Sequence, residues 1–161
     1  MKKQLSRPMR VILQYALIAV LTGLDRLIKV VVEENLRPEG SVQVIKGVLG
    51  LRYVQNTGAA FSSFSSNTTL LSIFTGAIIL GGLVYLALVK KPEKVYSVVV
   101  PIVLAGGLGN LVDRLIQGYV TDYIEVLFVN FAVFNFADIL VTCGCGVLVV
   151  ALIYSIASDK K

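Results

Sequence analysis

The chain has 161 residues, of which 56% are hydrophobic and 16% are charged. Soluble domains contain roughly 45–50% apolar residues, so this composition excludes an ordinary soluble domain and indicates an integral membrane protein. The formal charge is +5 and histidine is absent, which removes the imidazole base of serine and cysteine hydrolases and a common zinc ligand.

Four apolar stretches are each long enough to cross a hydrocarbon core about 30 Å thick, which takes about 20 helical residues. In chain order they are approximately residues 9–32, 70–89, 95–115 and 133–157. Basic residues occupy both chain ends and the link at 90–94, and the positive-inside rule places these three regions in the cytoplasm. We therefore expect one membrane domain over residues 1–161, with both termini cytoplasmic and the other two links outside.

The first span resembles a secretory signal because basic residues precede an apolar run. No small-x-small cleavage site follows it, so we interpret it as an uncleaved span. Near its outer end, Asp25 and Lys29 are spaced i, i+4. Such a pair can be a simple intrahelical ion pair or part of a site. We expect Arg26 to snorkel to the membrane interface.

The first outer link, residues 33–69, carries strand signals. Residues 41–45 and 48–54 are rich in β-branched, apolar and aromatic side chains, with a possible turn between them. We expect a small extracytoplasmic β element over about residues 36–66. The predicted fold class is an all-α integral membrane protein with four transmembrane helices, this small sheet and an outer loop.

The second outer link, residues 116–132, is unusually apolar, and its composition predicts short extended pieces at the interface. Asp122 lies in this link, and Asp138 lies near the outer start of the fourth span. Ionisable groups within or beside a span are costly and therefore functional candidates. Asp138 has no cationic residue within a helical turn. Cys143 and Cys145 are interpreted as small buried apolar residues.

Polar side chains from three spans fall at one depth. At about 1.5 Å per helical residue, Asp25, Asn110 and Asp113 lie roughly 22–27 Å from the cytoplasmic side, and Asp138 lies at the same outer level. Polar groups in lipid need partners, so one cleft that gathers them is expected. Asn110 alone could instead be a helix–helix hydrogen bond in a glycine-rich stretch, and Arg114 could be an interface anchor.

Several blocks of the sequence, in order, resemble lipoprotein signal peptidase, also called signal peptidase II. They are Asp25 with Lys29, residues 56–62, residues 106–114, residues 118–124 and residues 134–138. The resemblance implies an aspartyl endopeptidase of the bacterial cytoplasmic (inner) membrane, with its active site near the outer face. It also implies cleavage of prolipoproteins just before a cysteine that carries diacylglyceryl.

The resemblance further implies which residues carry the activity. Asp122 and Asp138 correspond to the catalytic dyad. The supporting or substrate-binding positions are Asp25, Lys29, Asn56, Gly58, Asn110, Asp113, Arg114, Asn135 and Ala137. No metal and no cofactor is expected. The expected partners are membrane-embedded prolipoproteins and the phospholipid bilayer, not nucleic acid, and the chain is expected to act as a monomer. Thr121 and Tyr123 stand where an apolar residue and Phe are commoner.

Two carboxyl groups held close can share a proton, so that one activates water while the other protonates a peptide carbonyl. Two other classes of function remain open from the residues alone. A small proton-coupled transporter or channel subunit would also place Asp and Asn in the membrane, and an assembly factor would use the outer sheet for docking. The transporter is disfavoured because the polar groups cluster at one level and form no ladder across the bilayer.

Overall fold

A computed structural model describes residues 6–58 and 68–158 of the chain. In order, the elements are α1 (Arg7–Glu39), β1 (Ser41–Ile45), β2 (Leu49–Asn56), α2 (Thr68–Leu88), α3 (Lys94–Gln117), β3 (Val120–Val126) and α4 (Phe136–Ser158). All four helices are long and apolar enough to cross a membrane. The expected fold class, four spanning helices with a small sheet, is confirmed.

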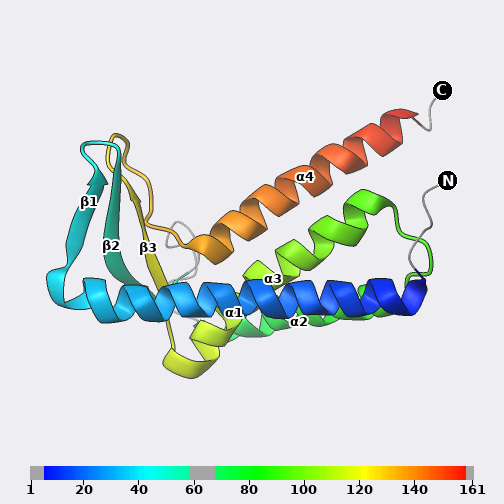
Figure 1. Ribbon diagram of the computed structural model, residues 1–161, viewed down its shortest axis with the longest axis horizontal. Helices are drawn as coiled ribbons and strands as arrows, with labels where there is room; N and C mark the ends of the chain where they lie inside the picture. The colour runs from blue at the N-terminus through cyan, green and yellow to red at the C-terminus, as the bar shows by residue number, and fades with distance from the viewer. Residues whose placement is uncertain (1–5, 59–67, 159–161) are drawn as a thin grey trace.

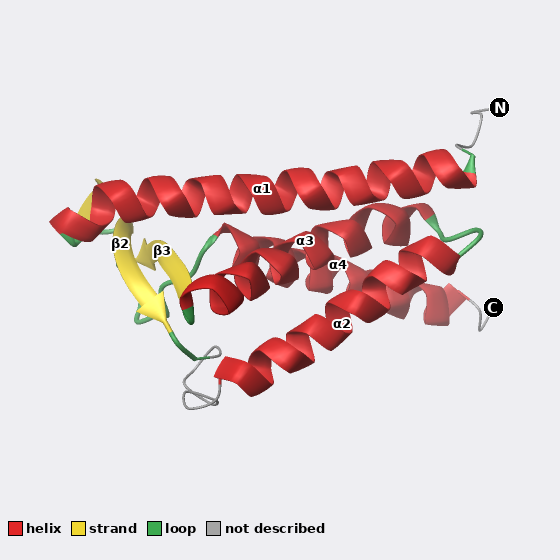
Figure 2. Cartoon of the chain, turned by 90° about the horizontal axis from the view of Figure 1, so that it is seen from below, coloured by secondary structure: helices red, strands yellow, loops and turns green. Residues whose placement is uncertain are grey.

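The helices form an elongated bundle with the sheet at one end (Figure 1). The start of α1 and the end of α4 lie at the opposite end (Figure 1). Helix α3 is central, because it packs against α1, α2 and α4, and Figure 2 shows it between α1 and α2. Any side chain on α3 near the sheet can therefore meet partners from several elements.

Helix α1 continues to Glu39, two turns beyond the apolar stretch that ends at residue 32. The added turns are polar on their outer face, but Val32 and Leu36 are buried and pack in one cluster with Tyr123 of β3. Gly40 ends the helix with a φ of 79°, and its N–H donates to the Leu36 carbonyl over 2.8 Å. The helix extends beyond the apolar stretch of the sequence because its last turns pack on the sheet.

The sheet has the order β1-β2-β3, and both pairs are antiparallel. Strands β1 and β2 form the hairpin expected in the first outer link. Strand β3 comes from the second outer link, where short extended pieces were expected, and it pairs with β2 so that Val54 lies opposite Asp122 and Asn56 opposite Val120. This long-range pairing brings Asn56 beside Asp122.

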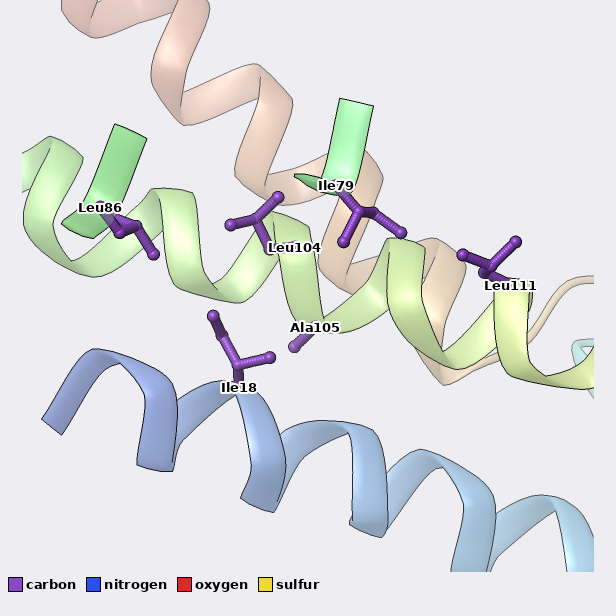
Figure 3. Packing of buried hydrophobic residues seen from close by; sticks show 6 residues of the cluster. All are labelled: Ile18, Ile79, Leu86, Leu104, Ala105 and Leu111. Carbon is purple, nitrogen blue, oxygen red and sulfur yellow. The ribbon is translucent and has the colours of Figure 1, made fainter. Parts of the chain in front are cut away.

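The core of the bundle is the interface of α1, α2 and α3. Figure 3 shows its buried residues, with Ile18 of α1 directed toward α3 near Ala105, and with Leu104 of α3 on the opposite side, where Ile79 of α2 lies. At the interface of α3 with α4, the backbones approach closely at Gly106: a Cβ there would lie 2.5 Å from the Ala137 carbonyl oxygen. This close approach sets the start of α4 against the outer half of α3.

Candidate active site

Asp122 and Asp138 line one cavity of about 500 Å³. Asp122 is the third residue of β3, and Asp138 lies in the first turn of α4. Asn56, Asn110 and Arg114 line the same cavity. The two carboxylates therefore face one space, although they lie sixteen positions apart in the chain and in two different secondary-structure elements.

The Asp122 carboxylate is buried and accepts two amide hydrogen bonds. Asn56 Nδ2 donates to Oδ2 over 2.8 Å, and Asn135 Nδ2 donates to Oδ1 over 2.6 Å. Burial and, to a smaller extent, the nearby Asp138 charge raise the pKa of Asp122 to about 6, although the two amide donors oppose this rise. Asp122 thus binds a proton far more readily than an exposed carboxylate does.

A reciprocal helix cap positions Asp138. Asn135 precedes α4, and its Oδ1 accepts the Asp138 N–H over 2.9 Å, while Asp138 Oδ2 accepts the Asn135 N–H over 3.1 Å. This is the geometry of a capping box, formed here by Asn and Asp. Asp138 Oδ1 accepts a third bond, from Asn110 Nδ2 over 2.7 Å. The cap at the start of α4 and the Asn110 amide of α3 together hold this carboxylate.

A charge cluster lies directly behind the cavity. The buried Lys29 ammonium contacts Asp25 Oδ2 at 2.8 Å and Asp113 Oδ2 at 2.9 Å, and it donates to Asn110 Oδ1 over 2.8 Å. Arg26 pairs with Asp113 Oδ1 at 3.2 Å and is partly exposed. The i, i+4 pair of Asp25 and Lys29 exists, but it is fully buried and joined to α3, so it is more than a surface ion pair.

The same cluster fixes the backbone around the two carboxylates. Asp25 Oδ1 accepts the Ala137 N–H over 3.1 Å at the start of α4. Asp113 Oδ2 accepts the Thr121 N–H over 3.3 Å in β3. Each residue whose N–H is held in this way immediately precedes one of the two aspartates. The structure thus brings Asp25, Lys29, Asp113 and Ala137 to the candidate site as supports and not as cavity walls.

Asn56, Gly58 and Arg114 form the wall nearest to α2. Asn56 Oδ1 accepts the Gly58 N–H over 2.9 Å. The Arg114 guanidinium is half-buried and lies within 3.5 Å of the carbonyls of Asn110 and Gly58. Its charge also interacts with Asp122 and Asp138. All eleven residues singled out from the sequence therefore lie at this one site or directly support it.

Several residues at the site were not among the predicted site residues, although Tyr123 was noted as standing where Phe is commoner. Tyr123 is buried and its hydroxyl accepts the Phe136 N–H over 3.2 Å, while burial raises the Tyr123 pKa to about 12. Phe131 and Phe134 line the cavity. The aromatic content of the second outer link was visible in the sequence, but its contact with the cavity depends on how that link folds back.

The interpretation of Cys143 and Cys145 as buried residues is wrong, because both are exposed and unpaired on α4. Cys143 lines the cavity one turn beyond Asp138. A residue in an apolar segment such as α4 need not be buried inside the protein, because it can face a cavity or lipid. Within residues 6–58 and 68–158, no group of three or more His, Cys, Asp or Glu side chains is placed to hold a metal ion.

Comparisons with known proteins agree with this geometry. A family model described as signal peptidase (SPase) II matches residues 17–154. Lipoprotein signal peptidase of Streptococcus pneumoniae is 36% identical over 140 residues, which cover 85% of this chain and 90% of that protein. Its counterpart in Lactococcus lactis subsp. lactis is 33% identical over 153 residues, 95% and 99% of the two chains.

Solved structures give the same result for the fold. A bacterial membrane enzyme determined by the in meso method at 2.3 Å resolution superposes with a TM-score of 0.83 and 26% identity, over 92% of this chain and 91% of that one. A second, at 1.9 Å resolution, has a TM-score of 0.76 and 26% identity, over 86% and 91%. The similarity therefore extends over nearly the whole bundle and sheet.

Proposed function

The chain belongs to the signal peptidase II family of lipoprotein signal peptidases, and from this premise we propose that Asp122 and Asp138 form an aspartic catalytic dyad. Family membership identifies a multi-pass bacterial membrane peptidase that removes signal peptides from lipoproteins, and it replaces the alternative of a proton-coupled transporter. The observation that supports the dyad is that both carboxylates line one cavity and accept hydrogen bonds from Asn135, whose side-chain amide donates to Asp122 and whose backbone N–H donates to Asp138.

The proposed reaction needs one proton shared between the two carboxyl groups. Asp122 carries this proton because burial raises its pKa to about 6. Asp138 removes a proton from a water molecule as the water oxygen attacks the peptide carbonyl, and Asp122 donates its proton to the carbonyl oxygen. When the C–N bond breaks, the carbonyl reforms and returns a proton to Asp122, while Asp138 gives its proton to the leaving amine. Both carboxyl groups then regain their starting states.

The supporting groups hold the two carboxyl groups in fixed positions relative to each other. Asn56 donates to Asp122 and Asn110 donates to Asp138, so each aspartate is held by an amide from a different element. Arg114 supplies a positive charge beside a pair that carries one negative charge throughout, and this charge moves from Asp138 to Asp122 as the protons transfer. These groups position the reacting atoms, which is the larger part of what a rigid site contributes.

Substrate access is proposed to be lateral. The cavity continues from Asp138 along α4 to Ile139, Thr142 and Cys143, and these three side chains are exposed on the helix. A signal helix in the bilayer can therefore present its end to the carboxylates while its lipid-modified cysteine stays among acyl chains. We place the site near the outer face of the cytoplasmic membrane, with both termini inside, and the scissile bond just before the diacylglyceryl-modified cysteine.

The direct test is cleavage of a purified, diacylglyceryl-modified precursor by the enzyme in lipid nanodiscs. Mass spectrometry is expected to find a mature product that begins with the modified cysteine. A precursor with the same sequence but an unmodified cysteine serves as the control and is expected to be cleaved poorly. A cut at another bond, or equal cleavage of both precursors, contradicts the proposed specificity.

The activity is expected to fall as the pH rises through about 6. Asp122 keeps its proton below its pKa of about 6 and loses it above, and a doubly ionised pair has no acid to donate. The profile of kcat/KM between about pH 4 and 8 measures this alkaline limb. Asn56→Ala removes a donor that lowers the Asp122 pKa, so the limb is expected to move to higher pH. A limb that stays in place, or moves to lower pH, contradicts Asp122 as the acid.

Cys143 and Cys145 provide a test of water in the cavity. Residues two apart on a helix project to different sides, and Cys143 but not Cys145 lines the cavity. Thiolates form and react only where water reaches them. Cys145→Ser protein, which keeps Cys143, is expected to react with a membrane-impermeant thiosulfonate at least about ten times faster than Cys143→Ser protein. Equal rates for the two variants in nanodiscs would show that the cavity is closed to water.

A further inference from the structure

We infer that Lys29 is a positioning residue for the dyad: its ammonium group fixes the orientation of the Asn110 amide and thereby makes Asn110 donate to Asp138. The inference concerns one hydrogen-bond relay, from α1 through α3 to α4. It rests on the proposed catalytic roles of Asp122 and Asp138, because only then does the state of the Asp138 carboxylate affect turnover.

The Lys29 ammonium has no freedom to serve another partner. Its side chain is fully buried, and its three contacts are Asp25 Oδ2, Asp113 Oδ2 and Asn110 Oδ1, all within 2.9 Å. An ammonium group has three N–H donors and no acceptor. Whatever side chain atom faces Lys29 from Asn110 must therefore be an oxygen.

The Asn110 amide then has only one allowed orientation. Its Oδ1 accepts from Lys29 Nζ over 2.8 Å and from Asn135 Nδ2 over 3.1 Å, which uses both lone pairs of the oxygen. Its Nδ2 lies on the other side and donates to Asp138 Oδ1 over 2.7 Å. A flipped amide would set N–H against N–H at Lys29 and oxygen against oxygen at Asp138.

The other two amides at the dyad are oriented by the main chain. Asn135 Oδ1 accepts the Asp138 N–H, and Asn56 Oδ1 accepts the Gly58 N–H. A backbone N–H, like an ammonium, can only donate. Every amide that donates to the dyad is thus held by a donor-only group on its oxygen side. For Asn110 that group is a side chain, and it can be replaced.

The charges around Lys29 decide how it can be tested. Asp25 contacts it from α1 and Asp113 from α3, and Arg26 pairs with Asp113. The backbone of β3 and α4 supplies N–H donors to these two carboxylates. The four side chains sum to zero charge. Removing Lys29 alone would leave a buried carboxylate without its cation, which is strongly destabilising. The informative variant therefore neutralises Asp25 at the same time.

The experiment is a double-mutant cycle in an Asp25→Asn background, with cleavage of the lipid-modified precursor as the assay. Adding Lys29→Met is expected to lower kcat at least about ten-fold and to leave KM within about two-fold. Adding Asn110→Leu instead is expected to lower kcat by at least as much. Adding both is expected to be no worse than Asn110→Leu alone, because Lys29 acts through that amide.

Three results overturn the inference. They are an unchanged kcat in the Lys29→Met variant, a change confined to KM, and a Lys29→Met effect of equal size with and without Asn110. Arg37→Met is the matched control: it also removes a cation from α1, but Arg37 is exposed and pairs with Glu33 at 3.7 Å, outside the charge cluster, so kcat is expected to stay within about two-fold. If Asp122→Asn and Asp138→Asn remain active, the proposed catalytic dyad is wrong. That result differs from additive effects of Lys29→Met and Asn110→Leu, which overturn only the role of Lys29.

A second variant keeps the inference testable if the Lys29→Met protein does not fold. Asn110→Asp retains an oxygen for Lys29 and replaces the group that donates to Asp138 with a second oxygen. The ion pairs of Lys29 persist in this variant, but two oxygen atoms then face each other at Asp138, so folding is checked by size-exclusion chromatography before the assay. The expected kcat is at least about a hundred-fold lower. Activity near the native level in this variant would show that donation by Asn110 is dispensable.

Discussion

Asp122→Asn and Asp138→Asn are each expected to lower kcat for a lipid-modified precursor by at least about a thousand-fold. Asparagine keeps the size of the side chain but can neither lend a proton to the carbonyl nor take one from water. The two carboxylates are held by separate amides in one cavity, so neither can replace the other. Single-turnover cleavage in nanodiscs is the measurement, and near-normal turnover by either folded variant removes that residue from the dyad.

The Asp122 variant carries its own control for folding. The pKa of Asp122 is raised from 3.8 to about 6 in the folded protein, so its contribution to stability is fully present below about pH 4 and is lost as the pH rises through 6. At neutral pH the ionised carboxylate therefore costs on the order of 3 kcal/mol. Asp122→Asn removes this cost but turns its own NH2 group toward one of the two amide donors, so it is expected to melt close to the native protein at pH 7, although it is inactive.

A matched control for the loss of a carboxylate lies on the same strand. Glu125 is three residues beyond Asp122 in β3 and pairs with the exposed Arg52 at 3.2 Å. Such a pair is worth at most about 1 kcal/mol. Glu125→Gln is expected to change both kcat and the melting temperature little, and a loss of activity as large as that of Asp122→Asn would point to a general effect on the strand.

Gly106→Ala is expected to damage both stability and activity. A Cβ at Gly106 would lie 2.5 Å from the Ala137 carbonyl oxygen and 2.9 Å from Val141 Cγ2, and a backbone oxygen cannot move aside without moving the start of α4. Overpacking of this kind costs about 1–3 kcal/mol. Since Asp138 directly follows Ala137, the shift also displaces a carboxylate, and a misplacement of about 1 Å can cost about a hundred-fold in rate.

Gly146→Ala, on α4, is expected to leave stability and activity intact, in contrast to Gly106→Ala. Nothing lies within 4 Å of a Cβ at that position, and Ala is favoured over Gly in a helix by up to about 1 kcal/mol. Its melting temperature is expected to equal or exceed that of the native protein, with unchanged kcat. Equal losses in the Gly106 and Gly146 variants would show that helix composition, and not the contact between α3 and α4, limits stability.

Some parts of the candidate site were readable from local sequence. Asp138 stood out because a carboxylate near a span without a cation one turn away is costly. The capping of α4 also has a local signature, since Asn135 and Asp138 are spaced as the two members of a capping box. Both depend on neighbours within four positions, and for such contacts spacing along the chain largely determines spacing in the molecule.

Other parts depend on contacts between distant segments. The spacing of Asp25 and Lys29 indicated one ion pair, yet Lys29 also binds Asp113 and Asn110 on α3. The second outer link supplied a third strand because β3 pairs with β2, which no local pattern specifies. Cys143 was expected to be buried but lines the cavity, because the direction of a small side chain on an apolar helix depends on how the helix is rotated in the bundle.

The sequence by itself determined the four spans, the small sheet and the family, because hydropathy and long ordered blocks of residues are properties of composition and order. Only the tertiary structure decided which amide donates to which carboxylate oxygen and which cation orients it. Those hydrogen bonds join α1, α3, β2, β3 and α4. A hydrogen bond forms only over a short distance, at most about 3.5 Å, and in a narrow range of angles, so its partners are decided by packing between elements and not by their order in the chain.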